Sequence, residues 1–107
     1  MKITDLSGQS SIGMAMLNRY KDKLTPLRQI NLMIWEGQQF LVVTGPKTTL
    51  ASNSFSWGKV DEWTRTLSQA TTVLGWPVPP EVLQQIPATE ERIIHTSRSY
   101  QGPRQRL

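Results

Sequence analysis

The sequence predicts an α+β domain in which an antiparallel sheet of three to four strands carries one long amphipathic helix on one face. Two observations lead to this prediction. From residue 27 to 55, apolar and polar residues alternate in short runs separated by glycine-containing breaks, as in strands joined by turns. From residue 57 to 74, the apolar spacing changes to three and four, as on one side of a helix. The short connections favour an antiparallel meander.

The start of the chain gives the least regular pattern. The first ten residues are polar, and we expect them to form a loose or extended arm. In the next ten residues, Ile12, Met14 and Met16 alternate with other residues, which favours a first strand. Ile12, Met16 and Tyr20 would equally lie together on one side of a helix. The sequence therefore leaves the choice between strand and helix open for residues 11–20.

A β-hairpin is predicted between residues 27 and 44, with a short glycine-containing connection at residues 36–38. Alternate residues from Ile30 to Ile34 would face one side of the sheet, whereas Trp35 would face the other. A further strand is expected over residues 48–55. It contains few apolar residues, so we expect it at an edge or with one face in water.

The amphipathic helix is predicted over about residues 57–74. Its apolar side, together with Trp76 just beyond it, is expected to lie in the core. The residues on that side are Val60, Trp63, Leu67, Ala70 and Leu74. The hydroxyl of Ser56 can cap the first turn. Gly75 follows where a left-handed residue would close the helix, and Pro77 prevents its continuation.

The C-terminal part changes in composition. A short second helix is expected near residues 80–86, with Pro80 at its first position. No acid follows Glu91, and we expect a mobile basic C-terminal tail. Residues 1–96 are therefore expected to form a single small α+β domain, and residues 97–107 a flexible basic tail.

Charge and composition narrow the function classes. The chain has 107 residues, with 12 Lys and Arg against 8 Asp and Glu, giving a formal charge of +4. This excess favours an anionic partner such as nucleic acid or an acidic protein face, although +4 is also an ordinary solubility charge. Without cysteine there are no disulfides, thiolate metal sites or cysteine nucleophiles. No stretch approaches the roughly 20 apolar residues of a membrane span, so we expect a cytoplasmic protein.

The sequence shows no arrangement typical of catalysis or of metal binding. His95 is the only histidine, and no orienting partner is evident for it. The adjacent acid pairs at 61–62 and 90–91 are expected to be solvated surface. Residues 45–49 lack the first glycine and the spacing of a phosphate-binding loop. We therefore expect no catalytic residue, no metal site, no cofactor and no enzymatic activity.

The aromatic residues next to cations predict a binding surface instead. Trp35 would lie on the sheet face opposite the helix, where an exposed ring can stack on a base while nearby cations meet the phosphates. Packing or a dimer contact is the alternative for this ring. The predicted nucleic-acid-binding residues, with Tyr20 as a second stacking ring, are Arg19, Tyr20, Lys21, Lys23, Arg28, Trp35 and Lys47.

The order of predicted elements over residues 11–75 resembles the β-β-β-β-α unit of the Whirly, Pur-alpha and positive-cofactor-four families. The best local match runs from Lys47-Thr48-Thr49-Leu50 through Ser56-Trp57 into the helix that carries Trp63. The resemblance implies binding of single-stranded DNA or RNA on a curved sheet, dimerisation largely through helices, and Trp35, Lys47 and the strand cations as binders. The prolines and arginines after Gly75 are not part of that pattern.

Taken together, the sequence predicts a non-enzymatic protein that binds single-stranded nucleic acid, as a homodimer, by phosphate neutralisation and base stacking. The alternative is a small protein-interaction or regulatory subunit. In that case the open sheet face or its edge would dock on a protein partner. The sequence does not distinguish DNA from RNA or the tail from the sheet as the binding element.

Overall fold

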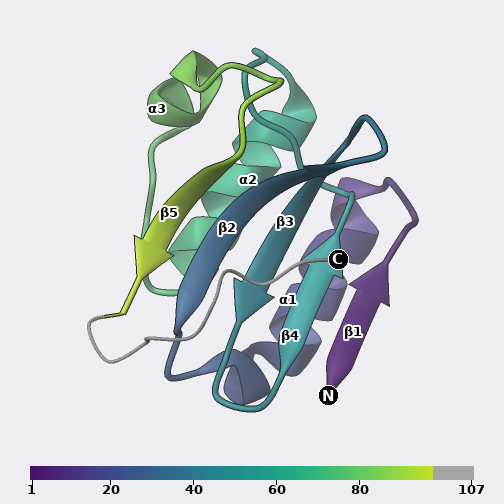
Figure 1. The fold of residues 1–107 in the computed structure, drawn as a ribbon, viewed down its shortest axis with the longest axis vertical. Coiled ribbons are helices and arrows are strands. Elements are labelled where there is room, and N and C mark those ends of the chain that lie inside the picture. Colours follow the sequence, from purple (N-terminus) through teal and green to yellow (C-terminus); the bar gives the residue numbers. More distant parts are fainter. Residues whose placement is uncertain (98–107) are drawn as a thin grey trace.

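Five strands form one mixed sheet in the order β1-β4-β3-β2-β5 (Figure 1), in a computed structural model that describes residues 1–97. Three helices complete this part of the chain. The elements are β1 (Lys2–Asp5), α1 (Ser10–Leu24), β2 (Gln29–Trp35), β3 (Gln38–Thr44), β4 (Thr49–Ser52), α2 (Glu62–Val73), α3 (Pro80–Gln85) and β5 (Arg92–Thr96). The predicted α+β class is confirmed. The sheet is larger than expected, and its β1–β4 pair is parallel.

The core lies between the sheet and the helices, because α1 and α2 both cover the same sheet face (Figure 1). Alternate residues of the central strands, among them Ile30, Leu32, Leu41 and Val43, point into this layer and are fully buried. The opposite face carries a smaller buried cluster made of Met33, Phe40, Val42 and Ala51. We call that second side, on which no described helix lies, the helix-free face.

The strand predicted within residues 11–20 is wrong, because this segment forms the helix α1. The buried positions Gly13, Leu17 and Leu24 define its inner face at helical spacing. Gly13 allows the helix to approach the chain after β4, since a Cβ there would lie 2.6 Å from the Ser54 Cβ atom. The alternation of Ile12, Met14 and Met16 therefore does not reflect a strand.

The first ten residues, predicted as an arm, supply an edge strand of the sheet. β1 pairs in parallel with β4, with Ile3 beside Leu50 and Asp5 beside Ser52. The strand predicted over residues 48–55 is thus confirmed in β4, but it lies between β1 and β3 rather than at an edge. The last strand of the described chain, β5, was not predicted.

The amphipathic helix is confirmed, but it begins later than predicted. Asp61, rather than Ser56, is its N-cap, and its carboxylate accepts a hydrogen bond from the Thr64 amide at 2.9 Å. Val60 precedes the helix and is 79% exposed, and Trp63 in its first turn is 43% exposed. The prediction that both lie in the core is therefore wrong.

The end of α2 follows the sequence closely. Gly75 has a φ of +84°, and its amide bonds to the Thr72 carbonyl while the Trp76 amide bonds to the Thr71 carbonyl, both at 3.0 Å. This is the Schellman arrangement that a glycine after the last turn indicates. Trp76 itself is half exposed, so its predicted core position is wrong. The short helix predicted near residues 80–86 is confirmed as α3.

The predicted hairpin is confirmed, and its turn contains a strained residue. Trp35 pairs with Gln38, which leaves Glu36 and Gly37 as a two-residue connection with φ values of 50° and 75°. Positive φ at both positions is typical of a type I′ turn, in which asparagine is preferred before glycine. Glutamate is sterically disfavoured at positive φ, whereas asparagine adopts this conformation more readily.

Replacement of Glu36 by asparagine is therefore expected to stabilise the fold. We expect the free energy of unfolding to rise by about 0.5–1 kcal/mol, measured by urea denaturation. Glu36→Gln is the matched control, because it removes the same charge and keeps the unfavourable backbone preference. Equal stabilisation by both variants would show that charge, and not the turn conformation, is responsible.

Candidate nucleic-acid interface

One end of the molecule brings together cations that are far apart in the sequence. Lys23, in the last turn of α1, and Lys47, in the β3–β4 turn, line one cavity of about 500 Å³. The two elements meet closely because Gly45 has no side chain, and a Cβ there would lie 2.6 Å from the Leu24 Cα atom. Arg28 lies beside the same turn, since its amide bonds to the Thr44 carbonyl at 2.8 Å. Two of the predicted cations, Lys23 and Lys47, thus line one cavity, and the backbone of Arg28 lies near the same turn.

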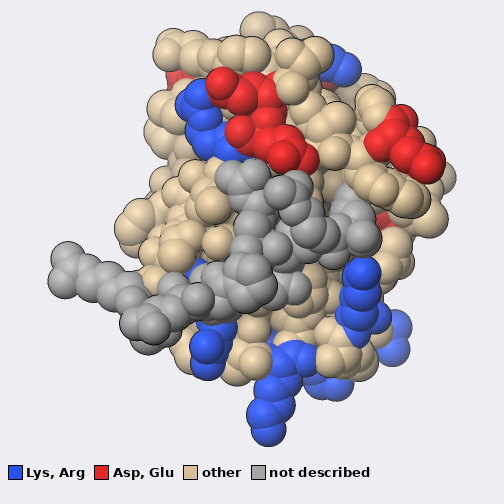
Figure 2. Space-filling view, viewed as in Figure 1, with Lys and Arg blue, Asp and Glu red and all other residues tan. Residues whose placement is uncertain are grey.

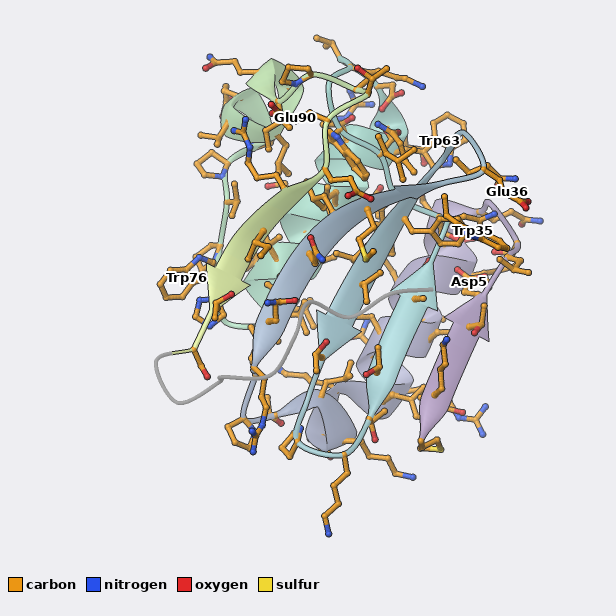
Figure 3. All side chains as sticks on the ribbon, viewed as in Figure 1. Asp5, Trp35, Glu36, Trp63, Trp76 and Glu90 are labelled. Carbon is orange, nitrogen blue, oxygen red and sulfur yellow. The ribbon has the colours of Figure 1, made fainter. Side chains whose placement is uncertain are left out.

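The charges of the folded part are separated along the molecule. Figure 2 shows a group of Lys and Arg without neighbouring acids at the lower end, whereas the acids lie toward the opposite end, where further Lys and Arg lie beside them. The acids there include Glu36 in the β2–β3 turn and Glu90 before β5, both labelled in Figure 3. Residues 1–97 contain nine Lys and Arg and eight Asp and Glu, so their net charge is small. We call the lower end the basic end. It differs from the rest of the surface because Lys and Arg gather there, although the net charge of residues 1–97 is small.

Trp35 lies away from the basic end, in a smaller cleft on the helix-free face. The cleft has a volume of about 220 Å³, and it is lined by Lys2, Thr4, Leu6, Trp35 and Phe40. The Trp35 ring is half exposed and meets the Phe40 ring edge-on, with 6.3 Å between the ring centroids. A half-exposed ring therefore shares its cleft with the exposed side chain of Lys2.

Lys2 connects the two regions. Its neighbour Met1 lines the cavity of Lys23 and Lys47, and the Met1 carbonyl accepts the Thr49 amide at 2.9 Å. Lys2 points to the helix-free face because Ile3, the next residue, points into the core. The first residues of the chain thus line both the cavity at the basic end, through Met1, and the Trp35 cleft, through Lys2 and Thr4.

Two predicted binders lie elsewhere. Arg19 and Tyr20 belong to α1, in the layer behind the sheet, and the Arg19 guanidinium lies 5.5 Å from the centroid of the Tyr20 ring. Tyr20 packs against the core, so the structure does not bring it onto the helix-free face with Trp35. Lys21 lies in the last turn of α1 with Lys23, where positive charge also favours the helix dipole.

Lys2 was not among the binding residues predicted from the sequence. The only available signal was the alternation of Lys2, Ile3, Thr4 and Asp5, in which the second and fourth residues are buried. Four residues are too few for that pattern to be recognised without the partner strand. Its place next to Trp35 follows from the parallel pairing of β1 with β4.

The part of the helix-free face nearest the basic end carries polar side chains that are buried. Gln29, Asn31 and Thr44 are each less than one-tenth exposed. Within residues 1–97, the Oε1 atom of Gln29, both polar side-chain atoms of Asn31 and the Thr44 hydroxyl have no hydrogen-bond partner. Such groups are costly, at roughly 1–3 kcal/mol each. These buried side chains are therefore not part of the exposed surface formed by Lys2 and Trp35.

Among residues 1–97, three titratable side chains have displaced pKa values. For Asp5, burial alone would raise the pKa, but hydrogen bonds from Ser54, Ser52 and Ser7 outweigh it, and the pKa is lowered. The Asp61 pKa is likewise lowered, mainly because bonds from Thr64 outweigh its desolvation. Burial lowers the pKa of His95, whose ring stacks on Trp76 with 4.2 Å between centroids.

Comparison with known protein families, with characterised proteins and with experimentally determined structures finds no match to this chain. In residues 1–97, no group of three or more His, Asp and Glu side chains is placed to hold a metal ion. No helix in that part of the chain is long and apolar enough to cross a membrane. The predicted tail, apart from Ser97, lies outside the described residues. The geometry of the basic end and the Trp35 cleft is thus the basis for a functional assignment.

Proposed function

We propose that this protein is a non-enzymatic binder of single-stranded nucleic acid. The strand would meet Lys23, Lys47 and Arg28 at the basic end and follow Lys2 to the Trp35 cleft. The single observation that carries the proposal is the shared cleft of Lys2 and Trp35. A half-exposed ring beside a cation provides both a stacking platform and phosphate neutralisation.

The length of the path suits a short strand. β2 runs from Gln29, next to the basic end, to Trp35, and its seven residues span about 20 Å at the rise of a β-strand. Sites on small sheet proteins that bind single strands cover roughly 4–16 nucleotides. A site near the lower limit of this range would connect the basic end to the ring.

The test is the affinity of Trp35→Ala for a fluorescently labelled oligonucleotide of about 12 nucleotides, measured by anisotropy. Loss of one stacked base is expected to weaken binding roughly tenfold, within the 1–3 kcal/mol that such contacts contribute. Trp76→Ala is the matched control, because Trp76 is 48% exposed, compared with 50% for Trp35, and also contacts an aromatic ring.

Equal losses in the two variants would contradict a stacking role for Trp35. Absence of binding at low salt would contradict the whole proposal, since phosphate contacts are strongest there. Light scattering of the same samples, with and without oligonucleotide, tests the predicted homodimer.

A protein-docking function is the second candidate, and the charge separation favours it. Trp35 lies with Glu36 at the acidic end (Figure 3), and Leu6 in the same cleft is 66% exposed. An apolar cleft near acids is suited to a basic, partly apolar protein segment. The test of this alternative is a pull-down with the original chain, treated with nuclease, that retains one protein in stoichiometric amount. Trp35→Ala would then lose that protein, whereas its affinity for the oligonucleotide would be unchanged.

A further inference from the structure

A separate cavity of about 560 Å³ lies on the other side of the β2–β3 turn. Its size falls within the range of small-molecule sites. It is built from the β2–β3 hairpin, the chain between β4 and α2, the first turn of α2 and the chain after α3. The residues that line it are Gly37, Gln38, Gln39, Asn53, Phe55, Ser56, Lys59, Asp61, Trp63, Ala88 and Thr89.

The cavity walls are held in place by hydrogen bonds. The side-chain amide of Gln39 donates to the carbonyls of Trp57 and Ala88, both at 3.0 Å. Gly58, with a φ of +77°, permits close contact of these two segments, because a Cβ there would lie 2.6 Å from the Ala88 amide nitrogen. The indole of Trp57 is buried and donates to the Glu90 carbonyl at 3.0 Å. The cavity is thus formed before any ligand binds.

One wall is an aromatic ring with a fixed orientation. Trp63 is 43% exposed, and its indole nitrogen donates to the Gly8 carbonyl at 3.1 Å. Figure 3 places Trp63 at the same end of the molecule as Trp35 and Glu36. A half-exposed ring held in one orientation favours stacking of a planar ligand, because little conformational freedom remains to be lost.

The amide of Gln38 supplies hydrogen bonds next to this ring. Within residues 1–97 its Nε2 group makes no hydrogen bond, and its Oε1 atom has only a long 3.5 Å contact with Asn53 Nδ2. Asn53 Oδ1 is already engaged by the Gly8 amide at 2.8 Å. A free donor beside an acceptor on one amide matches the paired groups on the edge of adenine.

The charges of the cavity favour a neutral ring. Lys59 and Asp61 line it together, so their charges oppose each other. The Asp61 carboxylate is also engaged by the Thr64 amide at 2.9 Å and by the Ser56 hydroxyl at 3.3 Å. An anion would gain little net attraction here, because the two charges oppose each other. An uncharged heterocycle can instead contact the Trp63 ring and the Gln38 amide.

We propose that this cavity binds a purine base, stacked on Trp63 and hydrogen-bonded by Gln38. The inference deepens the proposed function and rests on it, because Gln38 is the register partner of Trp35 and the two ring sites flank one hairpin turn. A strand that reaches Trp35 could pass its next base around the turn to Trp63.

Adenosine alone tests the cavity without an oligonucleotide. In the ¹⁵N-labelled full chain, each tryptophan gives its own indole N–H signal, assigned with single Trp→Phe variants. Adenosine is expected to shift the Trp63 signal and leave that of Trp76 in place. Uridine has the smaller ring and lacks the adenine edge, and it is expected to shift the Trp63 signal less. An unmoved Trp63 signal, or equal shifts with uridine, would overturn the proposal.

The Gln38→Ala variant tests the hydrogen bond and leaves the ring intact. We expect at least roughly fivefold weaker adenosine binding, the lower limit for a two-bond contact to a base. Gln69→Ala, an exposed glutamine on α2, is the control and should bind as the original chain does. Unchanged affinity in Gln38→Ala would overturn the assigned contact. Oligonucleotide binding that persists without any adenosine response would refute this inference alone, whereas loss of both would refute the proposed function as well.

Discussion

Replacement of Asp5 by alanine is expected to destabilise the protein by about 3 kcal/mol, measured by urea denaturation at neutral pH. The carboxylate is 3% exposed and lies at the end of β1. It accepts hydrogen bonds from the Ser7 amide at 2.9 Å, from the Ser52 hydroxyl at 2.7 Å and from the Ser54 hydroxyl. Alanine removes all three charge-assisted bonds and leaves the buried Ser52 hydroxyl without its acceptor, while the Ser54 hydroxyl keeps only its 3.2 Å contact with the Ser7 hydroxyl.

The destabilisation is expected to depend on pH. Because the Asp5 pKa in the folded state is lowered from 3.8, its contribution is complete above about pH 4 and is lost as the pH falls through the folded value. The difference in the free energy of unfolding between the original chain and Asp5→Ala should therefore become smaller at acidic pH. Asp5→Asn keeps the shape but not the charge, and its deficit should also narrow below pH 4.

Asp22→Ala is the control, because Asp22 is an exposed acid on α1. Its effect should stay within about 0.5 kcal/mol, as for most surface changes. A loss below 1 kcal/mol in Asp5→Ala would show that the carboxylate does not hold the end of β1 to β4.

The second large effect is expected at the basic end. Replacing Lys23 and Lys47 with glutamine should weaken binding of a single-stranded oligonucleotide roughly fiftyfold at 50 mM salt. Each phosphate contact on a single strand contributes about −0.7 to the slope of log affinity against log salt, so the slope should become less negative by between one and two. Titrations at several salt concentrations measure both quantities.

The double variant Arg65→Gln/Arg92→Gln removes the same total charge from other surfaces. Arg65 lies on α2, and Arg92, in β5, forms a surface ion pair with Glu90. A surface ion pair contributes little to stability, so the control should fold normally. If the two double variants lose the same affinity and slope, binding depends on net charge and not on the basic end.

The sequence was sufficient where structure depends on neighbouring residues. The hairpin of β2 and β3 follows from alternation around a glycine-containing turn, and the end of α2 follows from Gly75 and Pro77. The short helix α3 follows from Pro80 at its first position. Each of these features is decided within a few residues by φ preferences and side-chain periodicity, so no knowledge of the rest of the chain was needed.

The sequence was insufficient where a segment is stabilised by distant partners. Residues 11–20 carry both a strand pattern and a helix pattern, and packing of Gly13 and Leu17 against the core selects the helix. Trp63 has the helical spacing of a core residue, yet it lies in the first turn of α2 and is 43% exposed. Tertiary packing overrides local pattern in both cases.

The candidate site shows the same division. The sequence by itself determined that Trp35 lies on the sheet face opposite the core, because side chains alternate along a strand. It also identified Lys23, Arg28 and Lys47 as cations near the ends of elements. Only the tertiary structure decided that Lys23 and Lys47 line one cavity and that Lys2 shares a cleft with Trp35. The physical reason is that β1 pairs with β4, a contact between segments more than forty residues apart that no local pattern encodes.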